Sequence, residues 1–142
     1  MTPTVEWLAD LEALRALPQR YARGVDARDR VALGELFDPA GTVEGARGAH
    51  AAPDYLDNLC RGPRAFAVSM HVFADPLIDL APGGTEAAMD TYATVHQLRA
   101  AGEVGHDLLL GMRYRDSVVK HDGAWRIRHR RAETLWMRAL PR

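Results

Sequence analysis

The stretch Tyr114–Arg130 reads YRDSVVKHDGAWRIRHR and has the pattern of two β-strands joined by a tight turn. Asp122 and Gly123 form the expected turn, because both residue types tolerate the positive φ that a two-residue hairpin requires. Val, Ile, Trp and Tyr are frequent on either side of the turn, as is typical of strands. The stretch therefore predicts an antiparallel hairpin near the end of the chain.

Similar segments fill the second half of the chain. They are rich in Val, Ile, Tyr, Trp and Thr, and glycine-containing turn sequences separate them. We expect four long antiparallel strands, over residues 67–80, 85–100, 106–120 and 124–138.

The first third of the chain has the periodicity of helices. From Val5, apolar residues recur every three or four positions, which predicts an amphipathic helix ending near Asp26. Thr4 is placed to cap this helix, and Pro18 is expected to kink or divide it, because proline lacks a backbone donor. A second, short helix is expected from the cap Asp29 to Leu36.

Between these helices and the long strands, we expect a short strand over residues 42–44, a loop containing Gly45 and Gly48, and a helix over residues 53–60. Helices that precede a run of antiparallel strands indicate an α+β fold. No repeat, linker or low-complexity tract divides the sequence. We therefore expect one domain spanning residues 1–142.

Composition limits the possible partners. The chain has 142 residues, 18 Lys and Arg against 19 Asp and Glu, and a formal net charge of -1, so no overall positive field favours nucleic acid or anionic lipid. Cys60 is the single cysteine, which excludes an intrachain disulfide and a thiolate-rich metal site. No apolar run has the roughly 18 residues of a membrane helix. We expect a cytoplasmic protein with no nucleic-acid or membrane partner.

Several chemistries lack their motifs. The sequence has no GxGxxG after a strand, no GxxxxGK[ST], no HExxH and no GxSxG. None of the six histidines has another histidine two or four positions away, the spacings of many metal-binding pairs. We therefore expect no metal and no cofactor.

The order of the elements, the segment Tyr21–Asp29 (YARGVDARD) and the hairpin Tyr114–Arg130 together resemble the SnoaL-like branch of the nuclear-transport-factor-2-like superfamily. The resemblance implies a cone-shaped α+β barrel, with N-terminal helices packed on a strongly curved, mostly antiparallel sheet. This fold hosts scytalone dehydratases, polyketide cyclases, ketosteroid isomerases, epoxide hydrolases and non-catalytic binding proteins. The resemblance also implies a pocket that binds a small hydrophobic organic ligand. It further implies that the protein is a homo-oligomer, either a dimer or a trimer.

The resemblance also implies two catalytic residues. Asp26 and His71 match the aspartate and histidine that scytalone-dehydratase-like proteins keep on the first helix and the first long strand. An imidazole can exchange a proton at neutral pH, and a carboxylate partner would fix its tautomer. Without the resemblance, Asp26 would be interpreted as the end cap or part of the solvated face of a helix, and His71 as a histidine of the core or the surface. The family pattern also has a second histidine, a serine and an asparagine, at positions where this sequence has Gly102, Met112 and Tyr114.

Other side chains are candidates for binding the substrate. Phe73 lies on the predicted strand of His71, Tyr21 and Tyr55 are placed to close the pocket mouth, and Tyr114 is a potential donor to an oxyanion. Tyr92 and His96 share one face of their predicted strand. If that face lines the pocket, Tyr92 and His96 orient the substrate. Otherwise the pocket is lined by the opposite face of the strand, which carries Ala93, Val95 and Gln97.

The last predicted strand carries a basic stripe. Strict alternation places Trp125, Ile127 and His129 on one face and Arg126, Arg128 and Arg130 on the other. We expect the first face to be inward. The arginines then form a solvated or oligomer-forming stripe.

Together these features predict a cofactor-independent lyase, isomerase or cyclase that uses Asp26 and His71 on a small hydrophobic cyclic or polyketide-like substrate. One alternative is a non-catalytic binding or assembly module of the same fold. A further alternative is an epoxide hydrolase, in which Arg99 or Arg113 would act beside Asp26.

Overall fold

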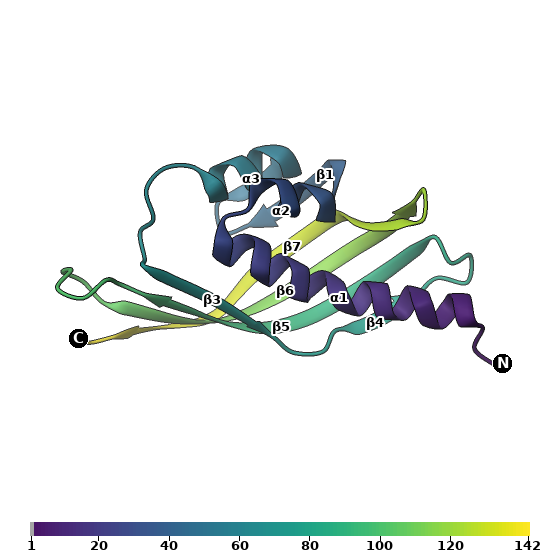
Figure 1. The fold of residues 1–142 in the computed structure, drawn as a ribbon. Helices are drawn as coiled ribbons and strands as arrows, with labels where there is room; N and C mark the ends of the chain where they lie inside the picture. The colour runs from purple at the N-terminus through teal and green to yellow at the C-terminus, as the bar shows by residue number, and fades with distance from the viewer. Residues whose placement is uncertain (1) are drawn as a thin grey trace.

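A computed structural model describes residues 2–142 and shows three helices packed against one face of a curved, unclosed sheet (Figure 1). The helices are α1 (Val5–Ala27), α2 (Arg30–Leu36) and α3 (Ala52–Cys60). The strands are β1 (Phe37–Gly45), β2 (Gly48–Ala51), β3 (Val68–Phe73), β4 (Leu77–Leu80), β5 (Glu86–Leu98), β6 (Asp107–His121) and β7 (Ala124–Leu140). This is the predicted α+β cone.

The sheet has the order β2-β1-β7-β6-β5-β3, and β4 also pairs with β5. All neighbouring strands are antiparallel except β1 and β7, which pair in parallel. Asp122 and Gly123 join β6 to β7 with φ of 50° and 78°, as the turn sequence predicts. We call the sheet face that carries the helices the inner face and the opposite face the outer face.

Three strand predictions are corrected. The strand expected at 42–44 begins earlier, at Phe37, because Phe37 already pairs with Ile127 of β7. The predicted loop at Gly48 opens β2, which pairs with β1. The strand expected over 67–80 is two strands, β3 and β4, which pair with different halves of β5. Pro76 lies between them and cannot donate a ladder hydrogen bond.

Helix α1 begins as predicted, with the Thr4 hydroxyl accepting a hydrogen bond from the Trp7 N–H at 3.1 Å. The helix continues through Pro18, so the expected division does not occur. Leu14, Leu17 and Tyr21 are buried along one stripe of the helix, and this packing offsets the hydrogen bond that Pro18 cannot make. Helix α1 therefore crosses the inner face as one element that ends beside β3.

Helices α1 and α2 approach each other closely at Gly24. A Cβ atom built on Gly24 would lie 2.8 Å from Cδ2 of Leu33, so only glycine fits without a shift. Asp29 caps α2 as predicted, since its carboxylate accepts a hydrogen bond from the Ala32 N–H at 3.0 Å. None of the three helices has a stretch long and apolar enough to span a membrane.

Candidate active site

The end of α1 and strand β3 bring Asp26 and His71 into contact. His71 Nδ1 lies 2.6 Å from Asp26 Oδ1, and the backbone N–H of His71 donates to Asp26 Oδ2 at 2.9 Å. Both oxygens of the carboxylate are thus held by one residue of β3. Ser69, two residues earlier on the same inner face, adds a longer hydroxyl contact to Oδ1 at 3.5 Å. The side chains of Asp26 and His71 are mostly buried, with exposed fractions of 22% and 10%.

The contact with Asp26 favours a tautomer of His71 that can accept a proton. A carboxylate next to Nδ1 favours the tautomer with the proton on Nδ1, which leaves Nε2 as a proton acceptor. Burial lowers the pKa of His71 below its ordinary value of 6.5, and the positive charge of Arg130 lowers it further, although Asp26 acts in the opposite direction. His71 is therefore a neutral imidazole at pH 7.

Aromatic side chains surround the His71 ring. Phe73 stacks on it with centroids 6.2 Å apart, and Tyr21 meets it edge-on at 6.1 Å. Tyr114, on the inner face of β6, packs against both Tyr21 and Phe73. Burial raises the pKa of Tyr21 and of Tyr114 well above 10. Both phenols stay protonated at neutral pH and can act as hydrogen-bond donors.

Arg130 is the main correction to the sequence analysis. It does not belong to an outward stripe; it is 1% exposed and lies on the inner face. Its Nε and Nη2 donate to the two oxygens of Asp116, each at 2.8 Å. Its Cζ lies 4.3 Å from the ring centroid of Tyr21 and 4.6 Å from that of Tyr114. A buried cation therefore supports the aromatic wall beside His71.

A register shift in β7 explains this correction. Ile127 pairs with Val118 and His129 with Ser117, so Arg128 has no residue opposite it. Such a β-bulge reverses the alternation beyond it. Trp125 and Ile127 are inward as predicted, but His129 is not; its Nδ1 lies 2.7 Å from the hydroxyl of Thr42. The signal that could have located Arg130 is Asp116, a carboxylate on the inner face that needs a cationic partner.

The face of β5 that lines the site is the one carrying Ala93, Val95 and Gln97. Ala93 and Val95 are buried, whereas Tyr92 is 55% exposed on the outer face. The expectation that Tyr92 and His96 bind the substrate is corrected by this placement. In the ladder His96 is paired between Met70 and Leu109, and Tyr92 lies over the outward Arg113.

A cavity of about 420 Å³ opens beside the His71 ring. Its volume is in the usual range for sites that bind small organic molecules. Tyr55 of α3 lines the cavity, while Tyr21 lies at its buried end rather than at the mouth. The remaining lining residues are Val25, Arg28, Leu59, Arg61, Pro63, Arg64, Ala65, Phe66, Ser69, Val95, Gln97, Leu110, Met112 and Tyr114.

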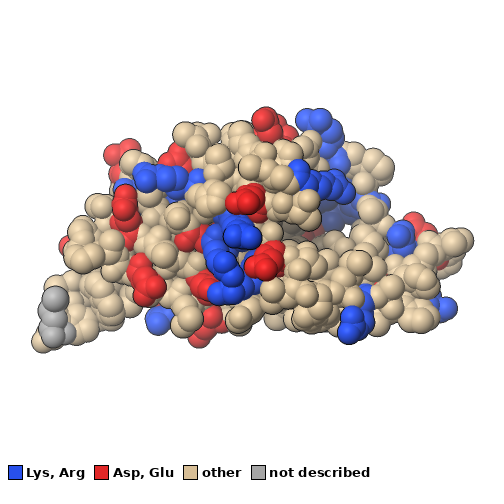
Figure 2. Space-filling view, turned by 180° about the vertical axis from the view of Figure 1, so that it is seen from behind, with Lys and Arg blue, Asp and Glu red and all other residues tan. Residues whose placement is uncertain are grey.

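Arg99 and Arg113 do not contact Asp26. Arg113 donates through Nε to Asp90 at 2.9 Å on the outer face, and Arg99 donates to the backbone carbonyls of His106 and Ala65. The epoxide-hydrolase arrangement with either arginine is therefore not formed. The face seen in Figure 2 shows acidic and basic side chains next to one another near its middle.

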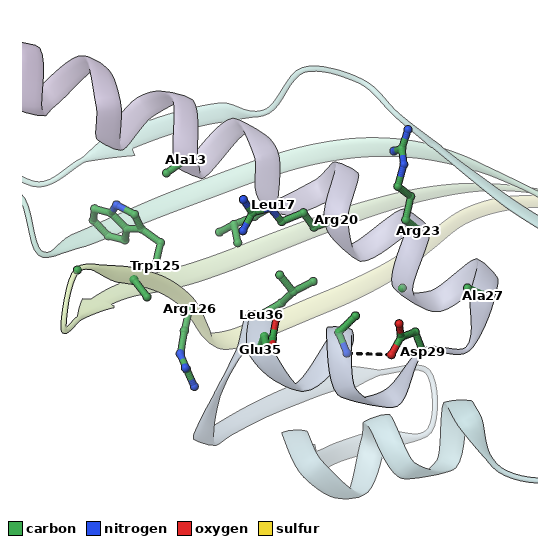
Figure 3. Close-up of a pocket in the computed structure, with 14 residues that line it drawn as sticks. Ala13, Leu17, Arg20, Arg23, Ala27, Asp29, Glu35, Leu36, Trp125 and Arg126 are labelled. Atoms are coloured by element: carbon green, nitrogen blue, oxygen red, sulfur yellow. Dashed lines mark hydrogen bonds between the residues drawn. The ribbon is translucent and has the colours of Figure 1, made fainter.

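A larger groove, of about 860 Å³, lies between α1, α2 and the turn that joins β6 to β7 (Figure 3). Leu17, Leu36 and Trp125 contribute to its wall, and one of its carboxylates, that of Asp29, is committed to the cap of α2. The groove has no histidine and none of the predicted site residues. Within residues 2–142, no group of three or more His, Cys, Asp and Glu side chains is arranged to hold a metal.

Comparisons with known proteins agree with this fold. The family model of the SnoaL-like domain matches residues 6–131. A hexachlorocyclohexane dehydrochlorinase, LinA type 2, superposes with a TM-score of 0.83 at 14% identity, covering 96% of this chain and 93% of that one. A proposed scytalone dehydratase from Novosphingobium aromaticivorans gives 0.78 at 22% identity, covering 96% and 91%. The LinA type 3 enzyme from Novosphingobium barchaimii gives 0.79 at 15%, covering 96% and 93%. The comparison with curated proteins found no match. At these identities the structural likeness establishes the fold alone.

Proposed function

The chain belongs to the SnoaL-like domain family, and from that premise we propose that it is a cofactor-independent lyase, isomerase or cyclase whose proton transfers depend on Asp26 and His71. The observation that carries the proposal is the 2.6 Å contact between Asp26 and His71, because the ring of His71 lines an aromatic cavity. The proposed substrate is a small hydrophobic cyclic or polyketide-like compound with a carbonyl, a hydroxyl or another leaving group.

In the proposed reaction, His71 Nε2 takes a proton from a carbon of the substrate. The released electron pair then forms a double bond and expels the leaving group, or it generates an enolate to which the proton is returned elsewhere. Asp26 holds the ring and stabilises the imidazolium that forms. Tyr114 donates to negative charge that develops on an oxygen, since its pKa stays above the working range.

The names of the structural neighbours favour elimination among these reactions. A dehydrochlorinase removes a proton and a chloride, and a dehydratase removes a proton and a hydroxyl group. Both require a base next to a carbon. The neutral imidazole of His71 on the wall of the cavity supports such a role.

A non-catalytic binding module of the same fold is the second candidate. Gly102, Met112 and Tyr114 at the positions of the further histidine, serine and asparagine favour it. Met112 lines the cavity without a hydroxyl group, so the cavity has one polar group fewer for chemistry. Binding requires no coupled acid-base pair, which separates the two candidates experimentally.

Asp26→Asn is expected to lower the pKa of His71 by about one unit or more, because the imidazolium loses the charge that stabilises it. NMR titration of the ring in both proteins measures this change without a substrate. Asp29→Asn is the matched control: it is three residues away, and asparagine preserves the cap of α2. An unchanged pKa of His71 in Asp26→Asn would remove the coupled pair and favour the binding module.

The pH dependence of kcat/KM follows from the neutral form of His71. Activity is expected to be level above about pH 7 and to fall about tenfold per unit below the pKa of His71, since the protonated ring cannot accept a proton. That pKa lies below 6.5. Initial rates from pH 4.5 to 9 measure the profile. Activity that instead rises as the pH falls would mean that the imidazolium is the active form.

We also propose that the protein acts in the cytoplasm as a homo-oligomer that pairs through the outer face of its sheet. Val72, Thr94, Gly111 and Trp136 form one row across four strands, and Val72 and Trp136 are 49% and 41% exposed. Val72→Glu is expected to convert the oligomer to monomers, because it would bury a charge at the contact. Sedimentation measures the mass, with Val104→Glu in an exposed loop as control. A wild-type monomer would contradict this proposal.

A further inference from the structure

The mouth of the cavity beside His71 is lined by arginines without acidic residues. Arg28 follows α1, and Arg61 and Arg64 belong to the segment of residues 61–67 that joins α3 to β3 (Figure 1). All three line the cavity, and none of its lining residues among the described part of the chain is Asp or Glu. The mouth therefore has a positive charge.

The hydrogen bonds of Arg28 and Arg64 fix the positions of these two side chains without neutralising them. Arg28 donates to the carbonyls of Leu59 at 3.3 Å and Gly62 at 2.9 Å, as well as to that of Arg61. Arg64 donates to the last carbonyls of α1, those of Asp26 and Ala27, at 3.1 and 3.2 Å. Carbonyl groups have no net charge. Within residues 2–142, neither these two nor Arg61 has a carboxylate within salt-bridge distance.

The interior of the cavity differs from its mouth. Leu110, Met112 and Val95 are apolar, Tyr114 is an uncharged phenol, and His71 is neutral at pH 7. The nearby carboxylate of Asp26 is engaged by His71 through both oxygens. The side chains that line the interior are thus uncharged, whereas the solvent-exposed rim is positive. An anion at such a rim keeps part of its hydration while it gains the attraction of several guanidinium groups.

We infer that the substrate of this site is an amphiphile, with an apolar ring that enters the cavity and an anionic group, a carboxylate or a phosphate ester, that stays at the mouth beside Arg28, Arg61 and Arg64. The inference rests on the proposed function for the reaction, but the binding preference follows from the arginines themselves. It narrows the substrate class from small hydrophobic cyclic or polyketide-like compounds to those that carry an anionic group.

Three probes with one ring system test this preference: 2-naphthoate, 2-naphthyl phosphate and the neutral 2-naphthamide. Isothermal titration calorimetry at low salt is expected to give a Kd about tenfold lower for at least one anion than for the amide, an advantage of the size that one or two exposed ion pairs provide. The advantage should decrease at 0.5 M salt, roughly as screening requires. Shifts of the His71 ring signals in NMR spectra establish that the probes occupy this cavity.

The double variant Arg61→Gln/Arg64→Gln is expected to remove most of the advantage of the anions and to leave the affinity for 2-naphthamide unchanged. Arg20→Gln/Arg23→Gln is the matched control, because these arginines line the other groove. The anion whose affinity exceeds that of 2-naphthamide by the larger factor identifies the preferred group, carboxylate or phosphate. Equal binding of the amide, an advantage that persists in the double variant, or no binding of either anion would overturn the inference. None of the probes has to react, so a failed search for turnover would leave this result intact.

Discussion

His71→Gln is expected to reduce kcat/KM by about 10²- to 10⁴-fold, because glutamine cannot accept the proton that the neutral imidazole takes. The loss should occur without unfolding. The glutamine amide can still donate to Asp26, and the side chain is of similar length. Turnover is measured on a panel of cyclic alcohols, ketones and chlorinated rings, and thermal unfolding of the same samples monitors the fold.

His96→Gln is the control for this prediction. His96 is also a strand histidine, but it lies on the outer face of β5 and not in the cavity. It is expected to retain the activity of the wild type. If His71→Gln turned over as well as His96→Gln, His71 would have no role as the base, and the binding module would become the better explanation of the site.

The strand pattern was sufficient to predict the second half of the fold. Strands β5, β6 and β7 lie within two residues of the expected bounds, because alternating apolar residues and the Asp122-Gly123 turn are local signals. The pairing of β1 with β7 was not predictable in this way. It joins residues about 90 positions apart, and the parallel pairing has no turn sequence to mark it.

The site was predictable only in part, and for a related reason. Asp26 and His71 are 45 positions apart, so no spacing rule connects them; the family resemblance alone pointed to the contact that the structure contains. The choice between the two faces of β5 depended on which face the helices cover. Arg130 was assigned to the wrong face because one unpaired residue, Arg128, reverses the alternation, and sequence periodicity does not detect such a bulge.

The pair of Arg130 and Asp116 provides the largest expected effect on stability. Arg130→Met is expected to lower the free energy of unfolding by about 3 to 5 kcal/mol, because it leaves the Asp116 carboxylate buried without its partner. Only 1% and 2% of the two side chains are exposed. Urea denaturation followed by circular dichroism measures the loss. If the single variant does not fold, the double variant Asp116→Leu/Arg130→Met is expected to fold, since apolar replacement of a whole buried pair is often close to neutral.

The pair of Arg113 and Asp90 offers the matched control, because it has similar bidentate contacts on the outer face with 29% and 32% exposure. Arg113→Met is expected to cost at most about 1 kcal/mol, as exposed pairs do. Equal losses for the two arginines would contradict the view that burial makes Arg130 important. A larger loss for Arg130 than for Arg113, with recovery in the double variant, would mean that the cation is required mainly to match Asp116. A higher pKa of His71 in the folded double variant would then indicate that the positive charge beside Tyr21 and Tyr114 helps burial to keep His71 neutral.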